Sequence, residues 1–311
     1  SYLGSFANPF DFPLPIAFSP GDLAIADIDN DGKLDVVTSD SNNSLISVSR
    51  NTGVAATIDE SSFVATVTLA VAGSGNGIQL TDIDLDGKMD IIATSSYTAQ
   101  VSIFRNAVTA PGPIDGTSFE PRIDLPTLSG PLGVRLGDLD GDLKPEIIVL
   151  SNEGLIAFSV YQNNTIPGTI QASSFGSRLD FVTVAGNRYC GLADLDGDGK
   201  LDAAVAGNNN VKKIGVFRNM SSPGLLDGTS LSKVDVATGD GPSFIAIGDL
   251  DEDTRPDLVT ANFSGSLSIS KNLITSSGAD LTITAHPSSK IICEGHPATF
   301  SAAASGASGI T

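Results

Sequence analysis

The feature that most constrains this chain is a nine-residue run of alternating carboxylates that returns five times at a nearly constant interval. The stretches read DIDNDGKLD (27–35), DIDLDGKMD (82–90), DLDGDLKPE (138–146), DLDGDGKLD (194–202) and DLDEDTRPD (249–257). Successive first aspartates lie 55, 56, 56 and 55 residues apart. A fixed period of this length predicts a repeat architecture that uses one structural unit five times.

Each period contains short segments typical of β-strands. In the third period they read RIDLP, GVRLGD, EIIVLS and IAFSVYQN, separated by Gly, Pro, Asn and Ser, and no stretch keeps a helical period. Four strands per unit, repeated in tandem, predict an all-β fold: a β-propeller of four-stranded blades. A β-solenoid has a much shorter period, and tandem β-sandwich domains need about 100 residues each. An asparagine closes every unit, at Asn51, Asn106, Asn163, Asn219 and Asn272.

The charge of the chain is concentrated in these runs. The net charge is −19, and four acids in each of five runs account for 20 of the 36 acidic residues. Nucleic acid is excluded as an expected partner, because no basic stripe is present to meet phosphates. No apolar run approaches the roughly 18 residues that a membrane-spanning helix needs.

The residue types in the runs point to calcium. Calcium takes six to eight oxygen ligands, and acids at positions 1, 3 and 5 of a tight loop can converge on one ion. A glycine at position 6 permits the turn, and the backbone carbonyl of position 7 and the acid of position 9 complete the ligand set. An EF-hand would need a Glu at position 12, which none of the five runs has. We therefore expect about five Ca²⁺ ions, with these ligands: Asp27, Asp29, Asp31, Lys33 and Asp35; Asp82, Asp84, Asp86, Lys88 and Asp90; Asp138, Asp140, Asp142, Lys144 and Glu146; Asp194, Asp196, Asp198, Lys200 and Asp202; Asp249, Asp251, Asp253, Arg255 and Asp257.

Two of the loops depart from the pattern. The third loop has Leu143 at position 6 and the fifth has Thr254, where the other three have glycine, and both have proline at position 8. Proline leaves the carbonyl of position 7 available. We expect calcium in these loops also, bound more weakly than in the others.

The unit resembles the FG-GAP/VCBS repeat, the calcium-binding blade of integrin α-chain propellers and of many large bacterial surface proteins. The matching features are the apolar strand that leads into D-x-D-x-D-G-x-x-D, the strand after it, and the strands QVSIFRN (100–106) and KIGVFRN (213–219). The resemblance covers about residues 5–275. It implies a propeller with one calcium ion per blade loop, serving mainly structure.

The repeat stops after Asn272, which divides the chain into two expected parts. Residues 1–275 form the propeller repeats, and residues 276–311 form a linker and an N-terminal fragment that resembles the start of an immunoglobulin-like domain. Cys190 lies in the first part and Cys293 in the second, so we do not expect them to pair. The five blades are expected to belong to a seven-bladed ring that lacks two N-terminal blades here; the alternative is a five-bladed ring.

The expected function is that of a secreted or cell-surface calcium-binding module. It would act in adhesion or ligand binding, with an unknown protein or glycan ligand at the cell surface, or as a structural module of a large surface protein. No enzyme is expected, because both histidines, His286 and His296, lie outside the repeats. The alternative is a carbohydrate-binding or carbohydrate-cleaving propeller, for which Tyr97, Tyr161 and Tyr189 are the available aromatic platforms.

Overall fold

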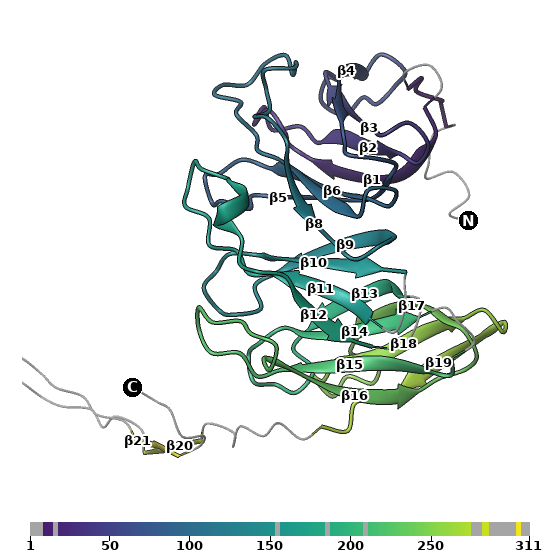
Figure 1. The fold of residues 1–311 in the computed structure, drawn as a ribbon, viewed down its shortest axis with the longest axis vertical. Coiled ribbons are helices and arrows are strands. Elements are labelled where there is room, and N and C mark those ends of the chain that lie inside the picture. The colour runs from purple at the N-terminus through teal and green to yellow at the C-terminus, as the bar shows by residue number, and fades with distance from the viewer. Residues whose placement is uncertain are drawn as a thin grey trace, which may run out of the picture.

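Antiparallel sheets follow the chain order: the first four succeed one another along the long axis of the molecule, and the fifth lies beside the fourth (Figure 1). The structure is a computed structural model that describes residues 9–14, 18–152, 156–183, 187–207, 211–274, 282–285 and 303–305. The predicted all-β repeat is confirmed, since the one helical element in those ranges is a 3₁₀ turn, η1 (Ala172–Ser174).

Four of the sheets have four strands and the fifth has three among the described residues. The first contains β1 (Pro20–Ala26), β2 (Asp35–Asp40), β3 (Leu45–Asn51) and β4 (Phe63–Ala70); the second contains β5 (Gly75–Thr81), β6 (Asp90–Ser95), β7 (Gln100–Phe104) and β8 (Ile123–Pro126). The third contains β9 (Pro131–Gly137), β10 (Glu146–Ser151), β11 (Ile156–Tyr161) and β12 (Leu179–Val182); the fourth contains β13 (Asn187–Ala193), β14 (Asp202–Gly207), β15 (Lys213–Asn219) and β16 (Leu231–Ala237). The fifth contains β17 (Pro242–Gly248), β18 (Asp257–Asn262) and β19 (Ser266–Ser270).

The grouping of strands into sheets differs from the grouping predicted within one sequence period. The segment RIDLP was expected to open the third unit, but β8 pairs antiparallel with β7 and is the outer strand of the second sheet. The same holds for β4, β12 and β16. Each outer strand is reached by a long connection after the closing asparagine, so the sequence period and the structural blade are out of phase by one strand.

The hydrophobic cores lie between successive sheets. Ile28 and Val37 of the first sheet pack with Ile78 and Ile91 of the second in one cluster, and three further clusters join the second to third, third to fourth, and fourth to fifth sheets. The second strands β6, β10 and β14 are buried at every residue, because each has a neighbouring sheet on both faces. This explains why these strands read as continuous apolar runs instead of alternating.

The first strands line up along the stack, and their spacing depends on glycine. β1 contacts β5, β5 contacts β9, β9 contacts β13 and β13 contacts β17. A Cβ atom added at Gly77 of β5 would lie 2.9 Å from the Cα atom of Gly133 on β9. A side chain at this crossing would therefore push the two sheets apart.

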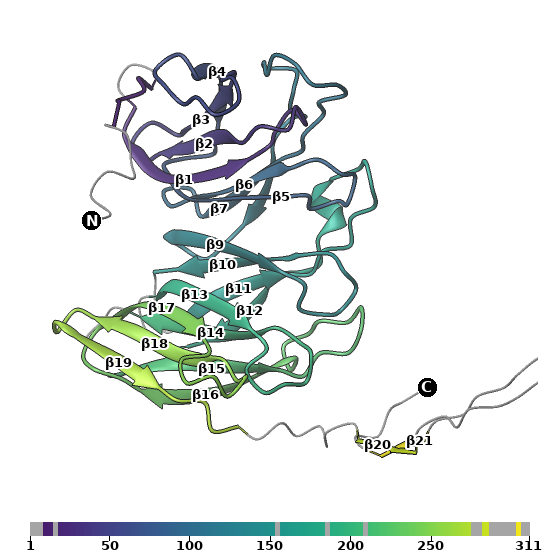
Figure 2. The same cartoon turned by 180° about the vertical axis from the view of Figure 1, so that it is seen from behind.

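The described sheets form an open arc. In both views (Figures 1 and 2) the first sheet lies at the top and the fifth lies in the lower half beside the fourth, away from the first, so the alternative of a closed five-bladed ring is wrong for this structure. In agreement with this, apolar residues on β1 and β19, including Leu23 and Leu267, are exposed instead of packed against each other.

Beyond the fifth sheet, the structure describes only β20 (Thr282–Ala285) and β21 (Ala303–Ser305), which pair antiparallel. Most of the expected immunoglobulin-like fragment, including Cys293 and both histidines, lies outside the described residues. Cys190 is a free, buried thiol in the core between the third and fourth sheets, as predicted. Burial raises the pKa of its thiol to about 12.

Candidate metal centre

Each aspartate loop joins the first strand of a sheet to the second, so the five loops lie at the same edge of their sheets. The first strand ends just before position 1, and the acid at position 9 is the first residue of the second strand. In the first sheet, for example, β1 ends at Ala26 and β2 begins at Asp35. The sequence pattern therefore places one acidic loop on every blade.

All five loops have the same backbone conformation, including the two that lack glycine. Positions 4 and 6 are left-handed in every loop; at position 6, φ is 86° at Gly32, 89° at Gly87 and 85° at Gly199, against 74° at Leu143 and 69° at Thr254. A left-handed conformation costs a non-glycine residue roughly 1–2 kcal/mol. Over positions 4 and 6 together, loops one, two and three each place one non-glycine residue in this conformation, loop four places none and loop five places two, so only loop five carries more strain than the others.

Hydrogen bonds from the backbone orient the carboxylates. The acid at position 1 accepts the N–H of position 6 in each loop, as Asp27 does from Gly32 at 2.8 Å and Asp138 does from Leu143 at 2.9 Å. The acid at position 5 accepts the N–H of position 7, as Asp31 does from Lys33 at 2.9 Å. The loop backbone therefore holds the acidic side chains inside the turn.

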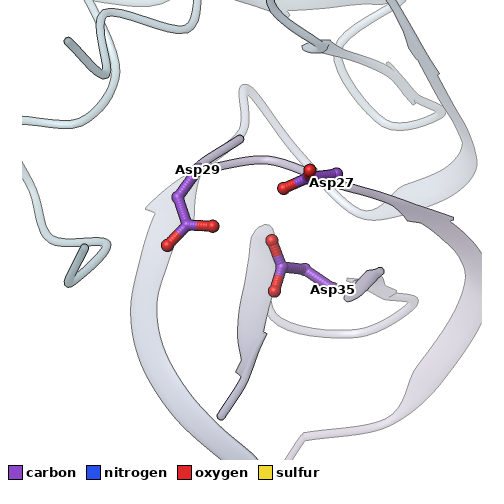
Figure 3. A group of neighbouring side chains, drawn as sticks. All are labelled: Asp27, Asp29 and Asp35. Atoms are coloured by element: carbon purple, nitrogen blue, oxygen red, sulfur yellow. The ribbon is translucent and has the colours of Figure 1, made fainter. Parts of the chain in front are cut away.

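In each loop, three carboxylates bring oxygen atoms within 4.8 Å of one another. Figure 3 shows the first group, in which the carboxylates of Asp27, Asp29 and Asp35 converge from the loop and from the start of β2. The other groups are Asp82, Asp84 and Asp86; Asp138, Asp140 and Glu146; Asp194, Asp196 and Asp202; and Asp249, Asp251 and Asp257. Position 5 belongs to the group only in the second loop. The acid at position 5 is paired with a Lys or Arg side chain in all five loops: Asp31, Asp86, Asp142, Asp198 and Asp253.

The acid at position 9 is the most deeply placed member of each site. Asp90 and Glu146 are fully buried, and each accepts two backbone N–H groups, one from position 2 of its loop and one from the closing asparagine. Burial raises the pKa of Asp90 to about 7, that of Glu146 to about 8 and that of Asp202 to about 6, and the neighbouring loop acids add to the shift. A cation at the site would favour the ionised form and reverse this effect.

A feature that sequence reasoning missed is a side chain that reaches each loop from the end of the third strand or from the residue after it. The residue before the closing asparagine donates to positions 3 and 5: Arg50 Nε lies 2.5 Å from Asp29 and its Nη2 lies 2.7 Å from Asp31. Arg105, Arg218 and Lys271 do the same in the second, fourth and fifth sheets. In the third sheet this residue is the uncharged Gln162, whose Nε2 donates to Asp140 at 2.6 Å. The signal was present in the repeated R-N dipeptides, but only the fold shows what the cation contacts.

The closing asparagine joins neighbouring blades. Asn219 Nδ2 donates to the carbonyl of Leu139, in the loop of the preceding blade, at 2.7 Å, and to the carbonyl of Leu201 in its own loop at 3.0 Å. Asn106, Asn163 and Asn272 make the same pair of bonds. The first four acidic loops are therefore each tied to the next blade through one amide.

The donor set fits a hard divalent cation. Two oxygen atoms that each lie about 2.4 Å from a common centre are at most about 4.8 Å apart, and the three oxygen atoms of each group lie within that limit. The donors are carboxylate oxygens only, which suits calcium or magnesium and not zinc or copper.

Comparison with known families decides the classification. The profile of the FG-GAP-like repeat matches residues 27–93, 82–149 and 194–260, more than half of the chain. The chain belongs to the FG-GAP-like repeat family. Each matched segment of this FG-GAP-like chain begins at position 1 of one acidic loop. Each ends within the second strand of the next sheet, which is β6, β10 or β18. A comparison with characterised protein sequences found no significant match.

Solved structures share the fold of this FG-GAP-like chain. BBS1N, in a crystal of its complex with ARL6DN soaked with mercury, superposes with a TM-score of 0.53 at 12% identity, over 86% of this chain and 70% of that one. The lead-soaked crystal of the same complex gives 0.49 at 12% identity, over 86% and 67%. The V. cholerae biofilm matrix protein Bap1 gives 0.45 at 17% identity, over 88% of this chain and 44% of that one. At these identities, the first match supports the fold alone. The described part of the FG-GAP-like chain contains no helix with the length and apolar character needed to cross a membrane.

Proposed function

We propose that this chain is a calcium-binding repeat module whose ions stabilise the blade loops. The observation that carries the proposal is the convergence of three carboxylates in each of five loops, at a separation that suits one calcium ion. Five unneutralised groups of this kind would repel internally. One dication in each loop would remove that repulsion and hold the first and second strands of the blade together.

The proposed ligands are the carboxylates at positions 1, 3, 5 and 9 and the carbonyl of position 7 of every loop. The arginine or lysine that pairs with positions 3 and 5 occupies one oxygen of each acid. In the first loop, Arg50 contacts the Oδ2 atoms of Asp29 and Asp31, and their Oδ1 atoms face the loop backbone. Each acid thus has a second oxygen to offer to an ion.

The expected binding is weak and structural. Calcium sites in extracellular modules have dissociation constants of about 10⁻⁴–10⁻³ M. At millimolar calcium each such site would add about 0.4–1.4 kcal/mol to the unfolding free energy. Five sites together matter against a typical total of about 5–15 kcal/mol. Sites this weak would stay empty where free calcium is submicromolar, so the proposal requires a secreted or cell-surface location.

We propose a role in adhesion, in binding a protein or glycan ligand, or in spacing the parts of a surface protein, without catalysis. Acids outside the loops have structural partners: Asp22 accepts the N–H of Ile78 across two sheets, and Glu120 pairs with Arg105. Residues 1–275 would act as the repeat module and residues 276–311 as the linker and the start of a second domain.

The described residues do not favour the carbohydrate alternative. Tyr161 is buried, and its hydroxyl donates to the carbonyl of Pro126, so its ring is not available for stacking. Tyr97 is exposed on the turn between β6 and β7, whereas Tyr189 lies on β13, partly buried against Phe244 and Arg135. The three tyrosines therefore belong to different sheets and form no common platform.

Calcium titration calorimetry on protein stripped of metal tests the proposal. We expect about five ions per chain and a loss of about one ion in the variant Asp196→Asn, in which one carboxylate of the fourth loop is neutralised. The matched control is Asp59→Asn, an acid outside the loops that accepts hydrogen bonds from Ser61 and Ser62. Absence of binding at millimolar calcium, or the same loss of an ion in the control, would refute the proposal.

A further inference from the structure

The third acidic loop differs from the other four in the side chain that faces it. We call the residue before the closing asparagine the facing residue of its loop. In the first, second, fourth and fifth sheets it is a cation that contacts the acids at positions 3 and 5: Arg50, Arg105, Arg218 and Lys271. In the third sheet the facing residue is Gln162, which carries no charge.

The second loop shows what a charged facing residue does to the acids. Asp84, at position 3, accepts a hydrogen bond on Oδ2 from Arg105 Nε at 2.8 Å and another from the N–H of Gly168, in the next blade, at 3.1 Å. The same guanidinium group also pairs with Asp86 at position 5. Asp29 of the first loop has the same two kinds of donor on its Oδ2 atom. The oxygen atoms on this side of these acids are therefore already bonded to a cation.

The acids of the third loop are held by fewer and weaker donors. Asp140, at position 3, accepts the neutral amide of Gln162 on Oδ2 at 2.6 Å, and no cationic group of the described residues contacts it. Gly224, the counterpart of Gly168, donates to the backbone carbonyl of Asp140 at 2.9 Å instead of to its carboxylate. Asp142, at position 5, keeps only Lys144 of its own loop, at 3.3 Å.

This difference affects the binding of a dication directly. A charged facing residue competes for the same carboxylate oxygen atoms and repels a second cation that enters the loop. A unit positive charge about 5 Å from a dication weakens its binding about tenfold, even at the dielectric constant of water. The amide of Gln162 orients Asp140 without this repulsion.

The backbone of the third loop offers no opposing reason for weak binding. It places one non-glycine residue, Leu143, in the left-handed conformation at positions 4 and 6, as the first and second loops do with Asn30 and Leu85. The N–H of Leu143 still donates to Asp138 at 2.9 Å, and three acids of the loop converge as in the others. The absence of glycine at position 6 therefore does not set this loop apart.

We propose that the facing residue ranks the loops for calcium, and that the third loop, which faces Gln162, fills first. This inference rests on the proposed calcium binding, and it reverses the order expected from the sequence for this loop. Asn219 and Gly224 of the fourth blade bond to the carbonyls of Leu139 and Asp140 in the third loop. The first ion thus stabilises the joint between the third and fourth blades, at calcium concentrations that leave the other loops empty.

A calcium titration of the metal-free chain, followed by two-dimensional amide NMR spectroscopy, reads each site separately. The N–H of position 6 donates to the acid at position 1 in every loop, so five amides report five sites: Gly32, Gly87, Leu143, Gly199 and Thr254. We expect the midpoint for Leu143 to lie at least about tenfold below the midpoints for Gly87 and Gly199, whose loops face arginine.

The variant Arg218→Gln gives the fourth loop the facing residue of the third. The midpoint for Gly199 should then fall about tenfold. Arg218 is suited to the test because its side chain is 48% exposed, so the variant should remain folded, which melting curves check. Arg178→Gln is the matched control: it removes the same charge from a pair with Asp180 on β12, and it should leave all five midpoints unchanged.

The outcomes separate this inference from the proposed function. Simultaneous filling of all loops, filling of the third loop after the others, or an unchanged midpoint for Gly199 in Arg218→Gln would overturn the ranking and leave calcium binding intact. An equal shift in Arg178→Gln would also overturn it, because the effect would then come from net charge alone. Amides that do not respond to millimolar calcium would overturn both the ranking and the proposed function.

Discussion

Replacement of Asn219 by alanine should weaken the joint between the third and fourth blades. Asn219 is fully buried, donates to the carbonyls of Leu139 and Leu201, and accepts the N–H of Ser221 at 2.9 Å. Each hydrogen bond contributes about 0.5–1.5 kcal/mol, and buried partners left without a bond add to the loss. The carbonyl of Leu139 keeps one donor, the hydroxyl of Ser221 at 2.7 Å. We therefore expect Asn219→Ala to lower the unfolding free energy by about 3 kcal/mol.

Asn51→Ala is the matched control. Asn51 occupies the same repeat position, but it belongs to the first described sheet and makes no hydrogen bond to the loop of another blade. Asn51 is only partly buried and bonds to Leu34 and Gly53 of its own sheet. Water can replace these bonds, so we expect a loss of about 1 kcal/mol. Equilibrium unfolding in urea at constant calcium measures both variants, with the slope of each transition checked for equality. An equal cost for Asn51→Ala and Asn219→Ala would refute the reasoning that the asparagine acts between blades.

Three further predictions concern the loops and the strand crossing. Without divalent metal, the unfolding free energy should fall by roughly a few kcal/mol between pH 5 and pH 8, because the folded-state pKa values of Asp90 and Glu146, about 7 and about 8, lie above their unfolded values. Saturating calcium should remove this dependence on pH. An unfolding free energy that does not change with pH in the metal-free protein would contradict the prediction. Gln162→Arg should weaken calcium binding at the third loop about tenfold, because it adds a positive charge beside Asp140, where the other blades already carry one. A terbium luminescence titration measures the affinity of this loop. An unchanged affinity would show that the cation facing the loop does not tune the site. Gly77→Ala should cost about 1–3 kcal/mol in thermal unfolding because of the approach to Gly133, whereas Gly228→Ala, with open space around it, should cost little; equal effects would contradict the close crossing.

Several features of the fold and the candidate site could be predicted because they depend on local chemistry. Carboxylates at alternate positions of a tight turn point towards one centre, whatever the rest of the fold. The spacing of Asp27 to Asp35 therefore predicted the five loops and the strand that follows each loop. The strand content and the number of units followed from the period. The buried state of Cys190 followed from its apolar neighbours.

Other features could not be predicted because they depend on residues far apart in sequence. The outer strand β8 joins the sheet before it, since its hydrogen-bond partners on β7 lie across a long connection. The cation that faces four of the five loops comes from the end of the third strand or the residue after it, as Arg105, next to β7, does for Asp84. Leu143 has a left-handed backbone conformation, which sequence analysis normally assigns to glycine. The hydrogen bonds of the surrounding loop hold Leu143 in this conformation.

The sequence by itself thus determined the repeat, the strand type and the acidic loops, because each of these is set by residues within a few positions of one another. Only the tertiary structure decided how the units meet. The closing asparagine of every sheet after the first reaches a loop about 80 residues away, and the same apolar positions are buried in one sheet and exposed in another. Identical local patterns acquire different environments because burial depends on whether a neighbouring sheet is present, a property of the arrangement of units and not of any one unit.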